Sequence, residues 1–161
     1  MGTSVGAGRG ARLAATAAIA DSFQVGDHLS TFGGNPVSCA ASLASIAFFE
    51  ETGLVEQSAK KGAALKARFE GLMREHQLIG EVRGKGLMIG VELVEDRTTK
   101  APASAAAGFV RQYCLDHGVL IGVGGNFASV LRIQPPLVIT ERETATGCRV
   151  FAEAVAALAR R

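Results

Sequence analysis

Residues 86–94 of this 161-residue chain read GLMIGVELV, and their alternation decides the kind of fold that we expect. Every second residue is apolar and branched, namely Leu87, Ile89, Val91 and Leu93. Because successive side chains of a strand point to opposite faces, this pattern predicts a strand that is buried mainly on one face. The RGKG segment at 83–86 is interpreted as the stretch that leads into it.

Helical patterns surround this strand in the sequence. Helices are expected over about 15–23, 36–51, 54–76 and 103–116, and after a capping box at Thr140–Glu143. Two further strands are expected over 119–123 and 128–134, the second of which ends at a pair of prolines. The order predicts an α+β fold in which a small, mostly antiparallel sheet carries helices on one face.

The composition excludes several classes of protein. With 48% hydrophobic residues, 20% charged residues and a net charge of +2, the chain is expected to be globular and to bind neither nucleic acid nor a membrane. Three widely spaced cysteines argue against a disulfide framework, and no metal site is predicted. The cysteines are interpreted as small buried side chains of a cytoplasmic protein. No structure is assigned to residues 1–14.

The segment STFGGN, residues 30–35, directly precedes the helix expected from Pro36. Ser30 and Thr31 offer hydroxyl groups, the two glycines offer unhindered amides, and a helix N-terminus follows. Donors in this arrangement bind anions such as phosphate. An ordinary turn capped by Asn35 explains the same residues. Both interpretations stay open on these residues alone.

Arg132 is the second candidate functional residue. In the segment SVLRIQPP, Leu131 and Ile133 share one face of the expected strand, so Arg132 projects from the face away from the main core. A guanidinium on a stiff strand can hold a carboxylate through two parallel N–H bonds. A surface arginine, or an ion pair with Glu92, is the alternative.

Three blocks of sequence together resemble the C-terminal third of a class III aminotransferase, a family that depends on pyridoxal phosphate. They are STFGGNPVSCAASLA at 30–44, GEVRGKGLMIGVEL at 80–93 and LRIQPPLVIT at 131–140. The resemblance covers roughly residues 16–161 and is strongest to the alanine–glyoxylate aminotransferase 2-like group. It implies the small C-terminal domain of the aspartate-aminotransferase-type fold. Residues 1–35 would then be a remnant of the large domain with the phosphate-facing loop, and 36–161 the C-terminal helix plus the small domain.

The resemblance also implies roles for individual residues. Thr31, with Ser30 beside it, matches a family threonine that contacts the cofactor phosphate of the other subunit in a dimer. Arg132 matches an arginine that holds the substrate α-carboxylate. The implied reaction transfers an amino group from an amino acid to a 2-oxo acid. None of the residues present is expected to be catalytic.

The chain departs from the family pattern where the Schiff-base lysine is expected, about 30 residues before the threonine motif. Residues 1–15 contain no lysine. We therefore expect a fragment that is inactive alone: a truncated gene, a shifted reading frame, or half of a split enzyme whose partner supplies the large domain. A non-catalytic module that dimerises or binds a carboxylate, and a poorly folding product, are the alternatives.

Overall fold

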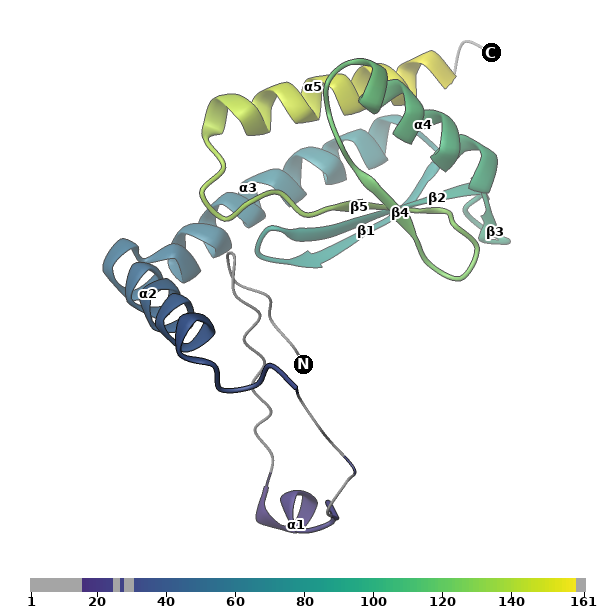
Figure 1. The fold of residues 1–161 in the computed structure, drawn as a ribbon. Coiled ribbons are helices and arrows are strands. Elements are labelled where there is room, and N and C mark those ends of the chain that lie inside the picture. The colour runs from purple at the N-terminus through teal and green to yellow at the C-terminus, as the bar shows by residue number, and fades with distance from the viewer. Residues whose placement is uncertain (1–15, 25–26, 28–30, 159–161) are drawn as a thin grey trace. The chain divides into compact units, whose positions relative to one another are not determined.

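The computed structural model describes residues 16–24, 27 and 31–158 (Figure 1). The chain divides into two units, Met1–Gly53 and Leu54–Arg161. The boundary expected from the sequence, between residues 35 and 36, stays a prediction. Within the described ranges, no helix combines the length and the apolar character that a membrane-spanning segment needs.

The first unit contains the short helix α1 (Ala17–Ala20) and the longer helix α2 (Pro36–Thr52). Pro36 occupies the first turn of α2 and Asn35 caps it, as predicted. Gly53 ends the helix in the left-handed conformation, with φ 60°. No residue of α2 is buried, and apolar side chains such as Val37 and Leu43 are largely exposed.

The second unit combines three long helices with a small sheet. The helices are α3 (Leu54–Glu75), α4 (Ser104–Asp116) and α5 (Glu141–Leu158). The strands are β1 (Ile79–Lys85), β2 (Met88–Asp96), β3 (Ala101–Pro102), β4 (Gly122–Gly124) and β5 (Val130–Ile133). Their order is β1-β2-β5-β4, with β3 paired to β2, and each pairing is antiparallel. The predicted α+β architecture is confirmed.

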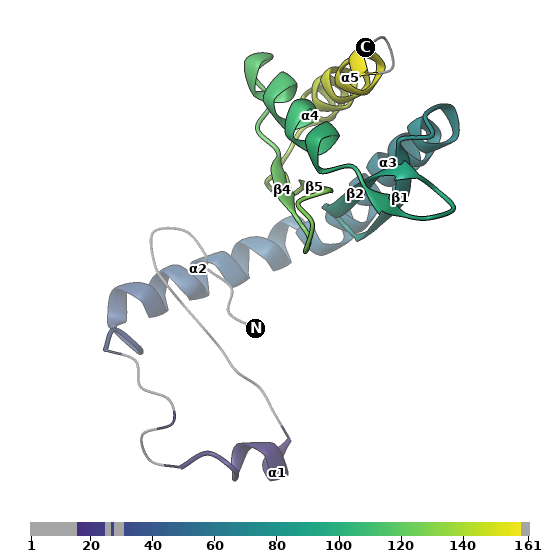
Figure 2. The same cartoon turned by 90° about the vertical axis from the view of Figure 1, so that its right-hand side faces the viewer.

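The three helices lie on the same side of the sheet (Figures 1 and 2). Helix α3 packs on β1 and β2, α4 packs on β2, β5 and β4, and α5 packs on both helices. The side chains of Phe69 and Phe151 meet inside this layer, with ring centroids 4.9 Å apart at 72°. Both rings are fully buried, and edge-to-face contact of this kind stabilises a core beyond the area it buries. The opposite face of the sheet carries no helix of this unit.

Strand β1 was not predicted as a strand. The RGKG segment does not simply lead into β2 but contains the last residues of β1, which forms a hairpin with β2. The register of the hairpin shifts between Ile79 and Glu81, and this irregularity places the buried residues Ile79 and Val82 three positions apart. A bulge of this kind removes the alternation by which a strand is recognised in a sequence.

Helix α3 approaches the β1–β2 turn very closely. A Cβ atom added to Gly62 would lie 2.1 Å from the carbonyl oxygen of Gly86. Gly86 has φ 55°, and the amide of the next residue, Leu87, donates to the Ser58 hydroxyl oxygen at 3.3 Å. Gly62 is therefore required by the contact between helix and hairpin.

The three cysteines lie in different environments. Cys114 is buried in α4, and burial raises the pKa of its thiol to about 11. Cys148 of α5 is half-buried, and burial also raises the pKa of its thiol. Cys39 is exposed on α2, so the expectation of a buried side chain is wrong for this residue in the structure.

Candidate functional site

The turn before α2 is organised by a single side chain, that of Asn35. Its Oδ1 accepts a hydrogen bond from the amide of Ser38 at 2.9 Å, and its Nδ2 donates to the carbonyl oxygen of Phe32 at 2.8 Å. Asn35 therefore caps the helix and braces the Thr31–Gly34 turn at the same time. Gly34 adopts φ 74°, a conformation that favours glycine.

Thr31 is exposed at the start of this turn. Its hydroxyl makes no hydrogen bond to any other described residue, whereas the Ser38 amide is already occupied by the cap. A Cβ atom at Gly34 would have nothing within 4 Å, so the turn is open. A free hydroxyl beside an unhindered turn fits a phosphate group. The other predicted phosphate residue, Ser30, lies outside the described residues, as does His28.

Arg132 lies in the middle of β5 on the helix-free face of the sheet, as predicted. The residues directly opposite it on the two neighbouring strands are both glycines, Gly90 of β2 and Gly122 of β4. The exposed Arg132 side chain lies over β4, where a Cβ at Gly122 would be 3.2 Å from its Nε atom. No hydrogen bond or ion pair joins Arg132 to another residue in the part of the chain that the structure describes.

Glu92 does not pair with Arg132, so the alternative ion pair is wrong for this structure. Its carboxylate instead accepts from Nη1 of Arg83 at 2.5 Å, and the same nitrogen donates to Glu81 at 2.7 Å. The hydrogen bond to Glu92, reinforced by the two negative charges, raises the pKa of the Arg83 guanidinium. Arg132 is thereby left as a cation without a counter-charge among the described residues.

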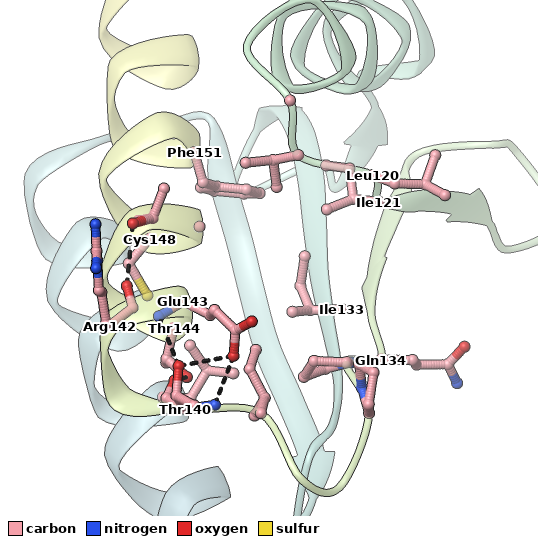
Figure 3. Close-up of a pocket in the computed structure, with 18 of the residues that line it drawn as sticks. Leu120, Ile121, Ile133, Gln134, Thr140, Arg142, Glu143, Thr144, Cys148 and Phe151 are labelled. Carbon is pink, nitrogen blue, oxygen red and sulfur yellow. Dashed lines mark hydrogen bonds between the residues drawn. The ribbon is translucent and has the colours of Figure 1, made fainter.

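A cavity of about 880 Å³ opens on the helix side of the sheet (Figure 3). Cys148 and Phe151 of α5 line one wall, and Ile121 and Ile133 line the opposite wall. Successive residues of β5 point to opposite faces, so Ile133 faces this cavity and Arg132 does not. The cavity is lined mainly by apolar side chains and is separate from the face that carries Arg132. It was not predicted from the sequence.

The capping box predicted at the start of α5 is present at the rim of this cavity. The Glu143 carboxylate accepts from the Thr140 hydroxyl at 2.7 Å and from the Thr140 amide at 2.8 Å, and the Glu143 amide donates back to the hydroxyl at 3.2 Å. The hydrogen bond from the Thr140 hydroxyl, and to a smaller extent that from the Thr140 amide, lowers the pKa of the Glu143 carboxyl group.

The described histidines and acids are the candidates for a second site. His117 ends α4, where its ring stacks on Tyr113 with centroids 4.1 Å apart. Its Nδ1 atom is 2.8 Å from the carbonyl oxygen of Tyr113. Over residues 16–24, 27 and 31–158, no group of three or more potential ligands is placed to hold a metal ion.

An antiparallel sheet covered on one face by three helices, with an exposed arginine on the other face, defines a small α+β domain of the type found in aminotransferases. Residues 4–155 match the family model for class III aminotransferases. The chain belongs to this family, whose members depend on pyridoxal phosphate.

Curated relatives support the same assignment. The alanine–glyoxylate aminotransferase 2 homolog 2, mitochondrial, of Arabidopsis thaliana is 46% identical over 114 residues, covering 71% of this chain and 24% of that protein. Isoleucine 2-epimerase of Lentilactobacillus buchneri is 46% identical over 132 residues, covering 81% of this chain and 29% of that protein. The predicted similarity to the alanine–glyoxylate aminotransferase 2-like group is confirmed.

Solved structures show the same fold. A Bacillus anthracis aminotransferase superposes with a TM-score of 0.76 at 35% identity, covering 81% of this chain and 30% of that one. An omega transaminase from Pseudomonas jessenii in complex with PMP superposes with a TM-score of 0.74 at 31% identity, covering 83% and 29%. The chain thus spans less than a third of the length of each of these relatives.

Proposed function

We propose that this chain supplies part of the active site of a class III aminotransferase, which moves an amino group from an amino acid to a 2-oxo acid. The observation that carries the proposal is the exposed Arg132 guanidinium on the helix-free face of the sheet, which has no ion-pair partner among the described residues. A guanidinium can bind a carboxylate through two parallel N–H bonds, which fix the orientation of the substrate as well as its charge. Arg132 would hold the carboxylate of the substrate in this way.

Thr31, together with Ser30, would hold the phosphate of pyridoxal phosphate across a dimer interface. The exposed Thr31 hydroxyl, which has no hydrogen-bond partner among the described residues, and the open turn at Gly34 support this role. A hydrogen bond to a charged group contributes about 1.5–3 kcal/mol. When bound, the cofactor supplies the electron sink that amino-group transfer requires.

The lysine that anchors the cofactor would come from outside these 161 residues. The five lysines present all follow Thr31 in the sequence, at positions 60, 61, 66, 85 and 100. Lys61 donates to the carbonyl oxygen of Ile139 at 2.8 Å and Lys66 pairs with Glu70 at 3.3 Å, so these two have structural partners. We therefore propose that the chain is inactive alone and that a large-domain partner supplies this lysine. A dimer with a second copy of the chain, in the cytoplasm, would bring Thr31 to the cofactor phosphate but would bring no further lysine.

A non-catalytic module that dimerises or binds carboxylates is the second candidate. The exposed apolar side chains of α2 favour it, because Val37 is 77% exposed and Leu43 64% exposed. The two candidates differ in whether pyridoxal phosphate takes part.

Ligand-observed NMR of pyruvate tests the assignment of Arg132. We expect the pyruvate methyl signal to broaden with the wild-type chain and with the Arg111→Gln control, which removes an exposed guanidinium of α4. Broadening should disappear with Arg132→Gln and return in part with Arg132→Lys. Equal broadening by the wild type and Arg132→Gln would refute the assignment.

Borohydride reduction in the presence of pyridoxal phosphate, followed by mass spectrometry, tests the proposed need for a partner. We expect no lysine of the isolated chain to be labelled stoichiometrically. Stoichiometric labelling of a single lysine would show that the chain anchors the cofactor itself.

A further inference from the structure

We propose that Arg83 is a positioning residue that holds Glu92 away from Arg132 and so keeps Arg132 free to bind a carboxylate. The inference rests on the proposed function of Arg132, because it assigns the means by which that site stays open. It concerns the face of the sheet that carries no helix of the second unit (Figure 2).

Glu92 lies within reach of two arginines. Arg83 and Arg132 are the direct partners of Gly90 on the two strands that flank β2. With neighbouring strands about 4.8 Å apart, the two arginines stand about 10 Å apart on either side of this glycine. Glu92 follows Gly90 by two residues on the same face, so it is the diagonal neighbour of both. Diagonal side chains about 7–8 Å apart are within the reach of an arginine.

The structure shows which arginine takes the carboxylate. Nη1 of Arg83 donates to Glu92 at 2.5 Å and to Glu81 at 2.7 Å, so one guanidinium holds an acid of β1 and an acid of β2. Arg97 and Lys100 line the same small cavity as Glu92, and Arg97 is held there by backbone carbonyl oxygens. Without Arg83, Glu92 would be free to turn towards Arg132 as well as towards Lys100. Arg83 therefore removes the intramolecular carboxylate that would compete with a ligand.

The sheet also gives the Arg132 side chain room on the side away from Glu92. Cβ atoms at Gly122 and Gly124 of β4 would lie 3.2 Å from its Nε and 3.1 Å from its Cδ. The side chain thus lies over glycine backbone of β4, whereas Glu92 lies on β2, the strand on the other side of β5. The Arg83 ion pairs and the glycines of β4 thus both keep the Glu92 carboxylate apart from the Arg132 guanidinium.

Variants of Arg83 and Glu92 test the inference through pyruvate binding. We expect Arg83→Gln to weaken pyruvate binding about three- to fivefold, the effect of one exposed ion pair. The double variant Arg83→Gln/Glu92→Gln should bind as the wild type does, and Glu92→Gln alone should bind no more weakly. If Arg83 acted instead only through its own positive charge, the effects of the two substitutions would add, so that Glu92→Gln would strengthen pyruvate binding by the same factor with and without Arg83, and the inference would be overturned.

A measurement without ligand separates this inference from the proposed function. The Nε–Hε resonance of Arg132, assigned with Arg132→Lys, should shift in Arg83→Gln and return to its wild-type position in the double variant. An unchanged resonance in Arg83→Gln would overturn the inference whether or not pyruvate binds. Failure of pyruvate to bind the wild type would instead refute the proposed function. Since Arg83 is exposed and Glu92 half-exposed, we expect both variants to fold, as their circular dichroism will show.

Discussion

Replacing Gly62 by alanine tests the closest contact between a helix and the sheet. The added Cβ would lie 2.1 Å from the carbonyl oxygen of Gly86 and 2.6 Å from its Cα, both backbone atoms of the β1–β2 turn. A side chain could rotate away from such a contact, but a turn cannot move without its strands. We therefore expect α3 and the hairpin to separate by a fraction of an ångström to about one ångström.

The expected magnitude is the difference between two opposing effects. Overpacking of a well-packed interior costs typically 1–3 kcal/mol and occasionally more. Alanine gains up to about 1 kcal/mol over glycine inside a helix. Because the obstructing atoms belong to the backbone, we expect the upper part of the overpacking range. The free energy of unfolding should then fall by about 2 kcal/mol, which in a domain of about 100 residues lowers Tm by roughly 10 °C.

The same helix offers a matched control at Gly71. A Cβ there would meet only the guanidinium end of Arg74, at an ordinary 3.8 Å. Thermal and urea unfolding followed by circular dichroism should therefore show Gly71→Ala at or above the wild-type stability and Gly62→Ala well below it. Equal stability of the two variants would refute the argument that the contact between α3 and the hairpin requires a glycine.

Two further outcomes are expected. Hydrogen bonds from Thr140 lower the pKa of Glu143, so their contribution to stability is present above the ordinary carboxyl pKa and is lost as the pH falls through the lowered value. The melting temperatures of the wild type and Glu143→Gln should therefore differ at pH 7 and converge towards pH 3. A difference that stays constant with pH would contradict this. The exposed Cys39 should react with a thiol reagent in the native chain, whereas Cys114, with a buried thiol and a raised pKa, should react only on unfolding. Rapid reaction of Cys114 in the folded Cys39→Ser variant would contradict its burial.

Much of the fold could be predicted from periodicity and from residues that begin or end elements. Asn35-Pro36 marked the start of α2, and alternation marked β2, because each of these features acts locally. Strand β1 escaped prediction because its bulge spaces Ile79 and Val82 by three residues. The strand expected at 119–123 is observed as β4 at Gly122–Gly124, since the apolar Leu120 is 81% exposed and lies outside the sheet.

The candidate site was predictable only in part. Alternation along β5 placed Arg132 on the correct face, but the sequence could not show whether Glu92 pairs with it. That answer depends on Arg83, which lies on the strand that was not recognised. The cavity beside α5 is lined by residues of α3, of the segment before β4, of the end of β5 and of α5, and no local pattern signals it. Contacts between segments distant in the sequence, rather than residue types, are what the sequence did not reveal.

Four of the five strands in the sheet of the second unit form two hairpins, β1–β2 and β4–β5, which are joined by the pairing of β2 with β5, while the short β3 pairs with β2. Each hairpin joins residues that are near neighbours along the chain, so either can form early at small entropic cost. The pairing of β2 with β5 can form only when the intervening segment, which contains α4, closes a large loop. We therefore expect the docking of the two hairpins through β2 and β5 to be the rate-limiting step of folding.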